Sequence, residues 1–333
     1  MTPGDEAIIT EWYRKIDGEI RIGLIQAEDD RSRQIQEFCE DFIRLAPGVR
    51  IEREENDGEQ APKISIGENI SYQAVPLGRE LVPFLDVLGG RDTPAGKLPL
   101  PVRDSLNQLR VPAMLKVYIA PQCPFCPQVV TLLLTLAASE SLIHITIIDG
   151  TMFSERAEND HVQSVPTVIL DDQFRWTGAI QLEELVHMML TRDPSQLGTD
   201  SLRKIIEQGD AAGLAQMMME SGKIYPAFLD LLTHAKWQIR LGAMVTFEFL
   251  AEERKEMASQ VIAPLWDRFP QVDDKVKGDI LYVLGESKDP GVIQKLNSVR
   301  NGPYSGEVLE AAVEALEKLS EEKKHEKTKA RKE

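Results

Sequence analysis

Two cysteines, Cys123 and Cys126, are separated by two residues at the point where a predicted strand passes into a predicted helix. The strand is the apolar run 115–119, and the helix is the apolar run 126–138. A helix N-terminus points unpaired N–H groups at the first sulfur, which favours its thiolate form. Cys123 is therefore the expected nucleophile in a dithiol redox site. Cys126, one helical turn along, is the expected resolving thiol.

Zinc binding is the main alternative use of these cysteines, since C-x-x-C is also half of a common zinc-binding pattern. Such a site needs two further ligands, but the only other cysteine is Cys39 and the five histidines have no paired spacing. A structural disulfide is a weaker alternative, because a two-residue loop constrains little unfolded chain. We therefore expect no metal, and no cofactor beyond the redox-active disulfide Cys123–Cys126.

A proline at the start of a predicted strand, in Ser164-Val165-Pro166-Thr167, is the second candidate element. The first residue of a strand can be proline because its missing N–H is tolerated there. In thioredoxin-like folds such a proline is cis and faces the C-x-x-C pair. We expect the backbone at Val165 and Pro166 to hold a substrate strand, with Pro124 and Phe125 also in contact with substrate. An ordinary trans proline at a sheet edge is the alternative.

The elements that must position these residues form one α/β pattern that occurs twice. In the first copy we expect helices at 5–17, 35–45 and 77–88, and strands at 20–25, 49–52, 61–66 and 70–74. In the second copy we expect strands at 115–119, 142–148, 165–170 and 173–176, and helices at 126–138, 153–160 and 182–190. A linker rich in proline and glycine, residues 90–101, joins the copies.

Only the second copy carries the thiol pair. In the first copy, Glu28-Asp29-Asp30-Arg31 takes the place of C-P-F-C. Cys39 lies two turns into the following helix on its apolar side, so we expect a buried structural thiol. The first copy is thus predicted to keep the scaffold without the redox chemistry.

Residues 5–192 resemble the N-terminal domain of the flavoprotein subunit of alkyl hydroperoxide reductase. They are more distantly similar to the glutaredoxin-like tandem protein disulfide oxidoreductases of archaea. The matching segments are Leu24-Ile25 with Glu28-Asp29-Asp30, A-V-P-L-G-R-E at 74–80, I-D-G at 148–150, C-P-F-C-P at 123–127 and Val165-Pro166. The resemblance implies two tandem thioredoxin-like folds.

The resemblance also implies that the domain passes electrons to a peroxiredoxin partner. It further implies that Glu80, in the P-L-G-x-E motif, lies near the active disulfide, where a carboxylate could accept the proton of Cys126 or tune the pair electrostatically. A solvated glutamate at a helix N-terminus is the alternative. No G-x-G-x-x-G opens a helix, so no nucleotide-binding domain is predicted, and we expect an external reductase.

From residue 196 onward the sequence predicts only helices. Three segments share an anchor pattern: Ile239, Ala243, Phe247 and Leu250; Val276, Ile280 and Leu284; and Val308, Ala312, Leu316 and Leu319. The apolar runs 262–266 and 292–296 lie between them. Paired helices at this spacing resemble HEAT repeats and predict a short α-solenoid, which would offer a surface for docking a partner. A small helical domain that merely packs on its neighbour is the alternative.

The net charge of −16 argues against nucleic acid or a membrane as the main partner, since both reward lysine and arginine. The start of the sequence does not resemble a secretory signal, and no apolar run reaches the ~20 residues needed to span a bilayer. The few cysteines favour a reducing cytoplasm, where such a pair is catalytic.

The sequence therefore predicts an α/β protein with an all-α extension. The expected parts are a thioredoxin-like fold without C-x-x-C (1–100), one with the active pair (101–195), HEAT-like repeats (196–320) and a charged tail (321–333). We expect a cytoplasmic thiol–disulfide oxidoreductase that reduces protein disulfides. A non-enzymatic scaffold, and a protein disulfide oxidase or isomerase, are the alternative functions.

Overall fold

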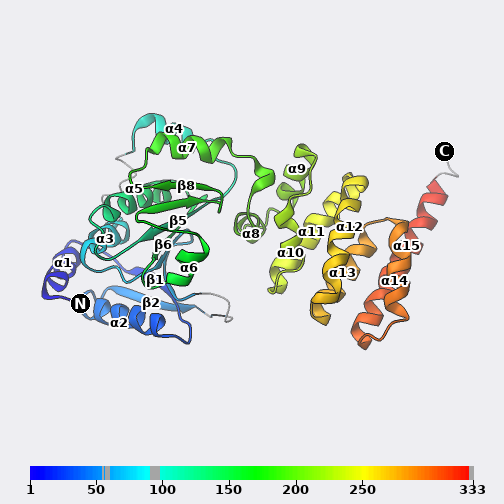
Figure 1. Ribbon diagram of the computed structural model, residues 1–333, viewed down its shortest axis with the longest axis horizontal. Coiled ribbons are helices and arrows are strands. Elements are labelled where there is room, and N and C mark those ends of the chain that lie inside the picture. The colour runs from blue at the N-terminus through cyan, green and yellow to red at the C-terminus, as the bar shows by residue number, and fades with distance from the viewer. Residues whose placement is uncertain (55, 57–60, 91–97, 330–333) are drawn as a thin grey trace. The chain divides into compact units, whose positions relative to one another are not determined.

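The computed structural model describes residues 1–54, 56, 61–90 and 98–329, and the side chains up to residue 320 (Figure 1). The chain divides into two compact units, Met1–Arg192 and Asp193–Glu333. Most of the predicted linker, much of the loop before residue 61 and the side chains of the predicted tail lie outside the described residues.

An eight-stranded sheet forms the centre of the first unit, with the strand order β2-β1-β3-β4-β6-β5-β7-β8. The strands are β1 (Ile20–Ile25), β2 (Val49–Glu54), β3 (Lys63–Ile66), β4 (Ile70–Gln73), β5 (Ala113–Ile119), β6 (Ile143–Asp149), β7 (Thr167–Leu170) and β8 (Phe174–Thr177). Each half begins with a parallel pair, β2 with β1 and β6 with β5, and continues with two antiparallel pairings. The two halves therefore have the same topology. Parallel pairing of β4 with β6 joins them into one sheet.

The helices of the first unit are α1 (Pro3–Tyr13), α2 (Asp30–Leu45), the 3₁₀ turn η1 (Gly78–Glu80), α3 (Leu81–Gly89), α4 (Leu100–Leu106), α5 (Cys126–Ser139), α6 (Ser154–Asn159) and α7 (Leu182–Thr191). The sequence patterns indicated all of them except α4. This short helix has Pro99 at its N-cap and Pro101 in its first turn. Two prolines so close together are typical of a linker, but proline is also compatible with the first turn of a helix. Helix α1 ends at Tyr13 rather than residue 17, and Gly18 then takes a left-handed conformation.

One continuous apolar core runs through both halves of the sheet. Helix α3 of the first half packs on α5 of the second half. In the first half, the core contains an aromatic group in which Phe84 meets Phe38, Phe42 and Tyr72 edge-on. Burial of these large side chains fixes α2 and α3 against the sheet. The start of α5, which carries Cys126, is therefore held by both halves.

Helices are the only regular elements among the described residues of the second unit. It contains η3 (Pro194–Gln196), α8 (Thr199–Glu207), α9 (Ala211–Ser221), α10 (Pro226–Leu232), α11 (Trp237–Glu253), α12 (Lys255–Arg268), η4 (Phe269–Gln271), α13 (Asp274–Glu286), η5 (Pro290–Val292), α14 (Ile293–Arg300) and α15 (Gly306–Lys329). Helices α11, α13 and α15 pack in series and carry the predicted anchors (Figure 1). Helix α12 packs on α11, and α14 packs on α15. Within the described part of the chain, no helix combines the length and apolarity required to cross a membrane.

Candidate redox site

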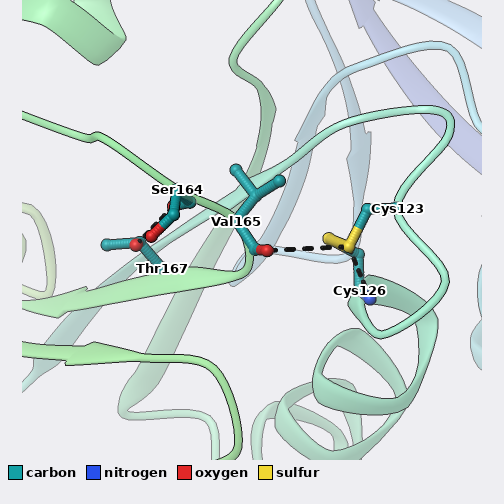
Figure 2. The surroundings of a disulfide bond; sticks show 5 residues. All are labelled: Cys123, Cys126, Ser164, Val165 and Thr167. Atoms are coloured by element: carbon teal, nitrogen blue, oxygen red, sulfur yellow. Dashed lines mark hydrogen bonds between the residues drawn. A yellow bond between two sulfur atoms is a disulfide. The ribbon is translucent and has the colours of Figure 1, made fainter.

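The two cysteines lie at the junction between β5 and α5, as the sequence predicted. Cys123 follows β5 in a short loop, and Cys126 is the first residue of α5. A disulfide joins them (Figure 2), and their Cα atoms are 5.6 Å apart. This spacing is usual for disulfide-bonded cysteines. The site is thus the oxidised form of a C-x-x-C pair at a helix N-terminus.

The two sulfurs are not equivalent. The Cys126 N–H donates a hydrogen bond to Sγ of Cys123 at 3.1 Å, so the first turn of α5 supports negative charge on that sulfur. Cys126 is fully buried, whereas Cys123 retains 7% exposure and Phe125 beside it is 68% exposed. Only Cys123 can meet a disulfide that approaches from outside. Pro124 is also exposed at this surface.

The segment before β7 faces the disulfide (Figure 2). The Val165–Pro166 peptide bond is cis, as expected from the sequence. The carbonyl oxygen of Val165 lies 3.8 Å from Sγ of Cys123, close enough to accept a weak hydrogen bond from its reduced thiol. The Thr167 hydroxyl donates to the Ser164 carbonyl at 2.7 Å and fixes the turn.

The corresponding site in the first half carries a carboxylate where the second half carries a sulfur. Oδ1 of Asp29 accepts a hydrogen bond from the Ser32 N–H at 2.8 Å, three residues along, just as Cys123 accepts from Cys126. Asp29 follows β1 by the same number of residues as Cys123 follows β5. The segment that replaces C-P-F-C is therefore residues 29–32, one residue later than predicted. In both halves the atom at this position accepts a backbone N–H at the helix start, where negative charge is favoured.

The Asp29 carboxylate is held in its charged form. Burial alone would raise the pKa of Asp29, but the Ser32 N–H and the Arg31 guanidinium together lower it below its ordinary value. Arg31 donates to Asp29 at 2.7 Å and lies over the ring of Phe153. The first half has no thiol at its helix start, and its free cysteine, Cys39, is buried in α2. Burial raises the pKa of Cys39 to about 12, so this thiol stays protonated.

Glu80 is buried, not solvated as the alternative interpretation required. It ends η1, which packs on α5, and only 3% of its surface is exposed. Neither carboxylate oxygen has a hydrogen-bond partner among the described residues. Burial raises the pKa of Glu80 to about 7, so the group can exchange a proton near neutral pH.

Asp149 is a residue near the site to which sequence analysis assigned no role. It ends β6, the parallel neighbour of β5, and lines the same cavity as Glu80 and the active-site loop residue Pro121. The signal was available, because the carboxyl ends of adjacent parallel strands meet at one edge of a sheet. Within the described residues, no cluster of three or more histidine, cysteine, aspartate or glutamate side chains could hold a metal ion.

Comparison with known proteins identifies a thioredoxin-like domain at this site. A family model described as a thioredoxin domain matches residues 113–191. Among solved structures, a protein disulfide oxidoreductase from Aeropyrum pernix is similar with a TM-score of 0.50 and 14% identity, over 57% of this chain and 92% of that one. At this identity, the match shows the fold alone.

Curated relatives match a longer stretch of the chain. An alkyl hydroperoxide reductase subunit from Staphylococcus epidermidis is 26% identical over 190 residues, which is 54% of this chain and 36% of that protein. A Bacillus subtilis protein named NADH dehydrogenase is 26% identical over 192 residues, or 55% of this chain and 37% of that protein. The match therefore spans well under half the length of these relatives. The resemblance to the N-terminal part of the reductase subunit is confirmed.

Proposed function

We propose that this chain, whose first unit resembles the N-terminal domain of the flavoprotein subunit of alkyl hydroperoxide reductase, is a thiol–disulfide oxidoreductase that reduces protein disulfides. The observation that carries the proposal is the geometry at Cys123. Its sulfur is the accessible member of the pair, accepts the Cys126 N–H at 3.1 Å and lies beside the Val165 carbonyl. These features supply a stabilised thiolate and a backbone edge for substrate.

In the proposed reaction, the reduced enzyme begins as a dithiol. The Cys123 thiolate attacks one sulfur of a substrate disulfide, that bond breaks, and the other substrate sulfur leaves as a thiolate. Cys126, after losing its proton, then attacks Sγ of Cys123. The second substrate thiol leaves, and the enzyme is left with the Cys123–Cys126 disulfide. Two electrons have passed to the substrate, and an external dithiol reductant must restore the enzyme.

The residues around the pair have distinct roles in this proposal. The backbone at Val165, next to the buried Pro166, pairs with the extended substrate segment. Pro124 and Phe125 contact the substrate surface, and the exposed Phe125 ring offers apolar area. Glu80, below the helix start, accepts the proton from Cys126, since its pKa of about 7 suits proton exchange at neutral pH.

The raised pKa of Glu80 predicts a pH-dependent stability. An unfolded glutamate loses its proton near 4.5, whereas folded Glu80 holds it to about 7, so the folded state binds more protons between these values. The free energy of unfolding must then fall as pH rises through this window. Relative to wild type, Glu80→Gln is expected to gain about 3 kcal/mol of stability between pH 4 and pH 8, because the amide cannot ionise.

Denaturant unfolding of the full chain at both pH values measures this difference. Glu37→Gln, which removes an exposed carboxylate of α2, is the matched control and should follow the wild-type pH dependence. If Glu80→Gln and wild type show parallel pH profiles, Glu80 does not keep its proton in the folded protein.

We further propose that residues 1–100 and 101–195 are two thioredoxin-like folds, of which only the second is redox-active. The equal strand order of the two sheet halves supports this division. Residues 196–320 would form HEAT-like repeats, supported by the serial packing of α11, α13 and α15, and residues 321–333 a charged tail. The repeats would dock a protein partner, either the reductase or a substrate such as a peroxiredoxin. A reducing compartment such as the cytoplasm suits this activity.

The proposed function is tested by reduction of insulin disulfides with dithiothreitol as electron donor. The full chain is expected to accelerate the appearance of precipitated insulin B chain over dithiothreitol alone. A rate equal to the uncatalysed background would reject the proposed activity.

A further inference from the structure

A cavity of about 370 Å³ lies in the first unit and reaches the loop that carries Cys123. Its walls come from α2, the segment from β4 to η1, the loop after β5 and the residues that end β6. Pro121 of the active-site loop is part of the wall, and it precedes Cys123 by two residues. The two Cα atoms are therefore within about 8 Å of one another. A molecule bound at Cys123 could place a side chain in this cavity.

The polar wall of the cavity is acidic. Its carboxylates are Glu37, Asp41, Glu80 and Asp149, and the lining residues include no lysine, arginine or histidine. Asp41 has a partner outside the cavity, since Arg44 lies 2.7 Å away. A free amino group on Met1, which also lines the cavity, would still leave the carboxylates in excess. Such a site repels anions and attracts cations.

Glu80 is the second, independent observation that indicates a ligand. Glu80 lines this cavity, and only 3% of its surface is exposed. Among the described residues, neither of its carboxylate oxygens has a hydrogen-bond partner. Buried polar groups are normally satisfied, because leaving one without a donor is costly. A donor that enters from the cavity would satisfy this carboxylate.

The remaining wall is apolar and includes Phe38, Leu77 and Ile119. Lysine and arginine combine an aliphatic stem with a cationic head, so they match a pocket with apolar walls and carboxylates. A metal ion fits less well, since no cluster of three ligating side chains is placed for one in the described part of the chain. The ligand chemistry is thus an organic cation on an apolar stem.

We propose that this cavity receives a basic side chain of the disulfide substrate, from a residue close in sequence to the substrate's reactive cysteine. The inference rests on the proposed function and adds a substrate class to it: protein disulfides with an adjacent arginine or lysine. The cation pairs with Glu37 at the exposed side of the cavity and donates a hydrogen bond to Glu80 at its buried side. The acidic charge of the chain then serves recognition beside the redox site.

The test uses the full-length protein, reduced, and disulfide-bonded peptides that differ at one position. One series carries arginine at each of the three positions on either side of the cysteine, and the matched series carries citrulline, which has the same shape without the charge. At the preferred position, kcat/KM is expected to be about tenfold higher for arginine, since a charge-assisted hydrogen bond is lost with citrulline.

Glu37→Gln is expected to lower the arginine-to-citrulline ratio at that position to about threefold. The matched control is Glu40→Gln, which removes an equal charge from the same helix but lies outside the cavity and should keep the wild-type ratio. Equal rates for the arginine and citrulline peptides at every position would overturn the inference. The same arginine-to-citrulline ratio in Glu37→Gln and Glu40→Gln would also overturn it, because it would indicate long-range attraction only. Failure to reduce any peptide would instead reject the proposed function.

Discussion

Replacing Cys123 by serine is expected to lower insulin reduction to the rate of dithiothreitol alone. The hydroxyl of serine is not ionised at neutral pH and cannot form the mixed disulfide on which the exchange depends. Cys126 cannot take over, because it is fully buried. The loss should therefore be complete rather than partial. Initial rates of insulin precipitation at equal protein concentration measure it.

Cys39→Ala is the matched control for this experiment. Cys39 is 1% exposed in α2, and burial raises its pKa to about 12, so it has almost no thiolate at neutral pH. Its removal should leave the turnover rate within about twofold of wild type. Undiminished activity in Cys123→Ser, or loss of activity in Cys39→Ala with its fold intact, would contradict the assignment of the nucleophile.

Replacing Cys126 by serine is expected to stop turnover at the mixed disulfide. Cys123 would still attack the substrate, but no second thiol would be close enough to release it. The expected product is a covalent complex of the enzyme with one insulin molecule, in nearly one-to-one yield. Non-reducing gel electrophoresis and intact mass measurement detect this complex, and dithiothreitol should release the enzyme by reducing the mixed disulfide.

The double variant Cys123→Ser/Cys126→Ser is the control, and it should form no adduct. A stable adduct in the double variant would place the reactive thiol at Cys39. Rapid multiple turnover by Cys126→Ser would mean that a substrate thiol, not Cys126, resolves the intermediate. Either result would remove the division of roles between the two sulfurs.

The asymmetry of the sheet is informative about how the site is built. Each half has an electronegative atom at the start of a helix, α2 in the first half and α5 in the second. This atom accepts a hydrogen bond from the backbone N–H three residues further along the chain. In the first half this atom belongs to Asp29, which binds Arg31 and cannot exchange electrons. The first half nevertheless contributes Glu80 and the α2 wall of the cavity to the active half. The first half, which has no cysteine pair, therefore lines a cavity that reaches the loop of Cys123.

Most of the fold followed from local patterns in the sequence. Strands β5 and β6 are rich in apolar residues, and α5 is an apolar run that starts at a cysteine pair, so their burial could be inferred directly. The cis peptide bond at Pro166 followed from its pairing with the upstream cysteines. These features depend on short stretches of chain whose local preferences agree with the overall fold.

The features that were missed depend on contacts distant in sequence. Helix α4 is short and begins with two prolines, and its burial through Val102 and Leu106 is visible only once the sheet is assembled. The one-residue error at Asp29 arose because the sequence does not show which oxygen caps α2. The acidic cavity joins Glu37, Glu80 and Asp149, which no local spacing connects.

The reduction potential of the Cys123–Cys126 couple tests the central claim most directly. The full-length chain would be equilibrated with dithiothreitol buffers of defined potential, and the fraction of free thiol at each potential measured by alkylation and mass. A reductase is expected to have a potential of about −270 mV, as thioredoxin does. A value of about −120 to −180 mV would indicate a disulfide oxidant or isomerase. A pair that does not titrate would show that the site is not redox-active.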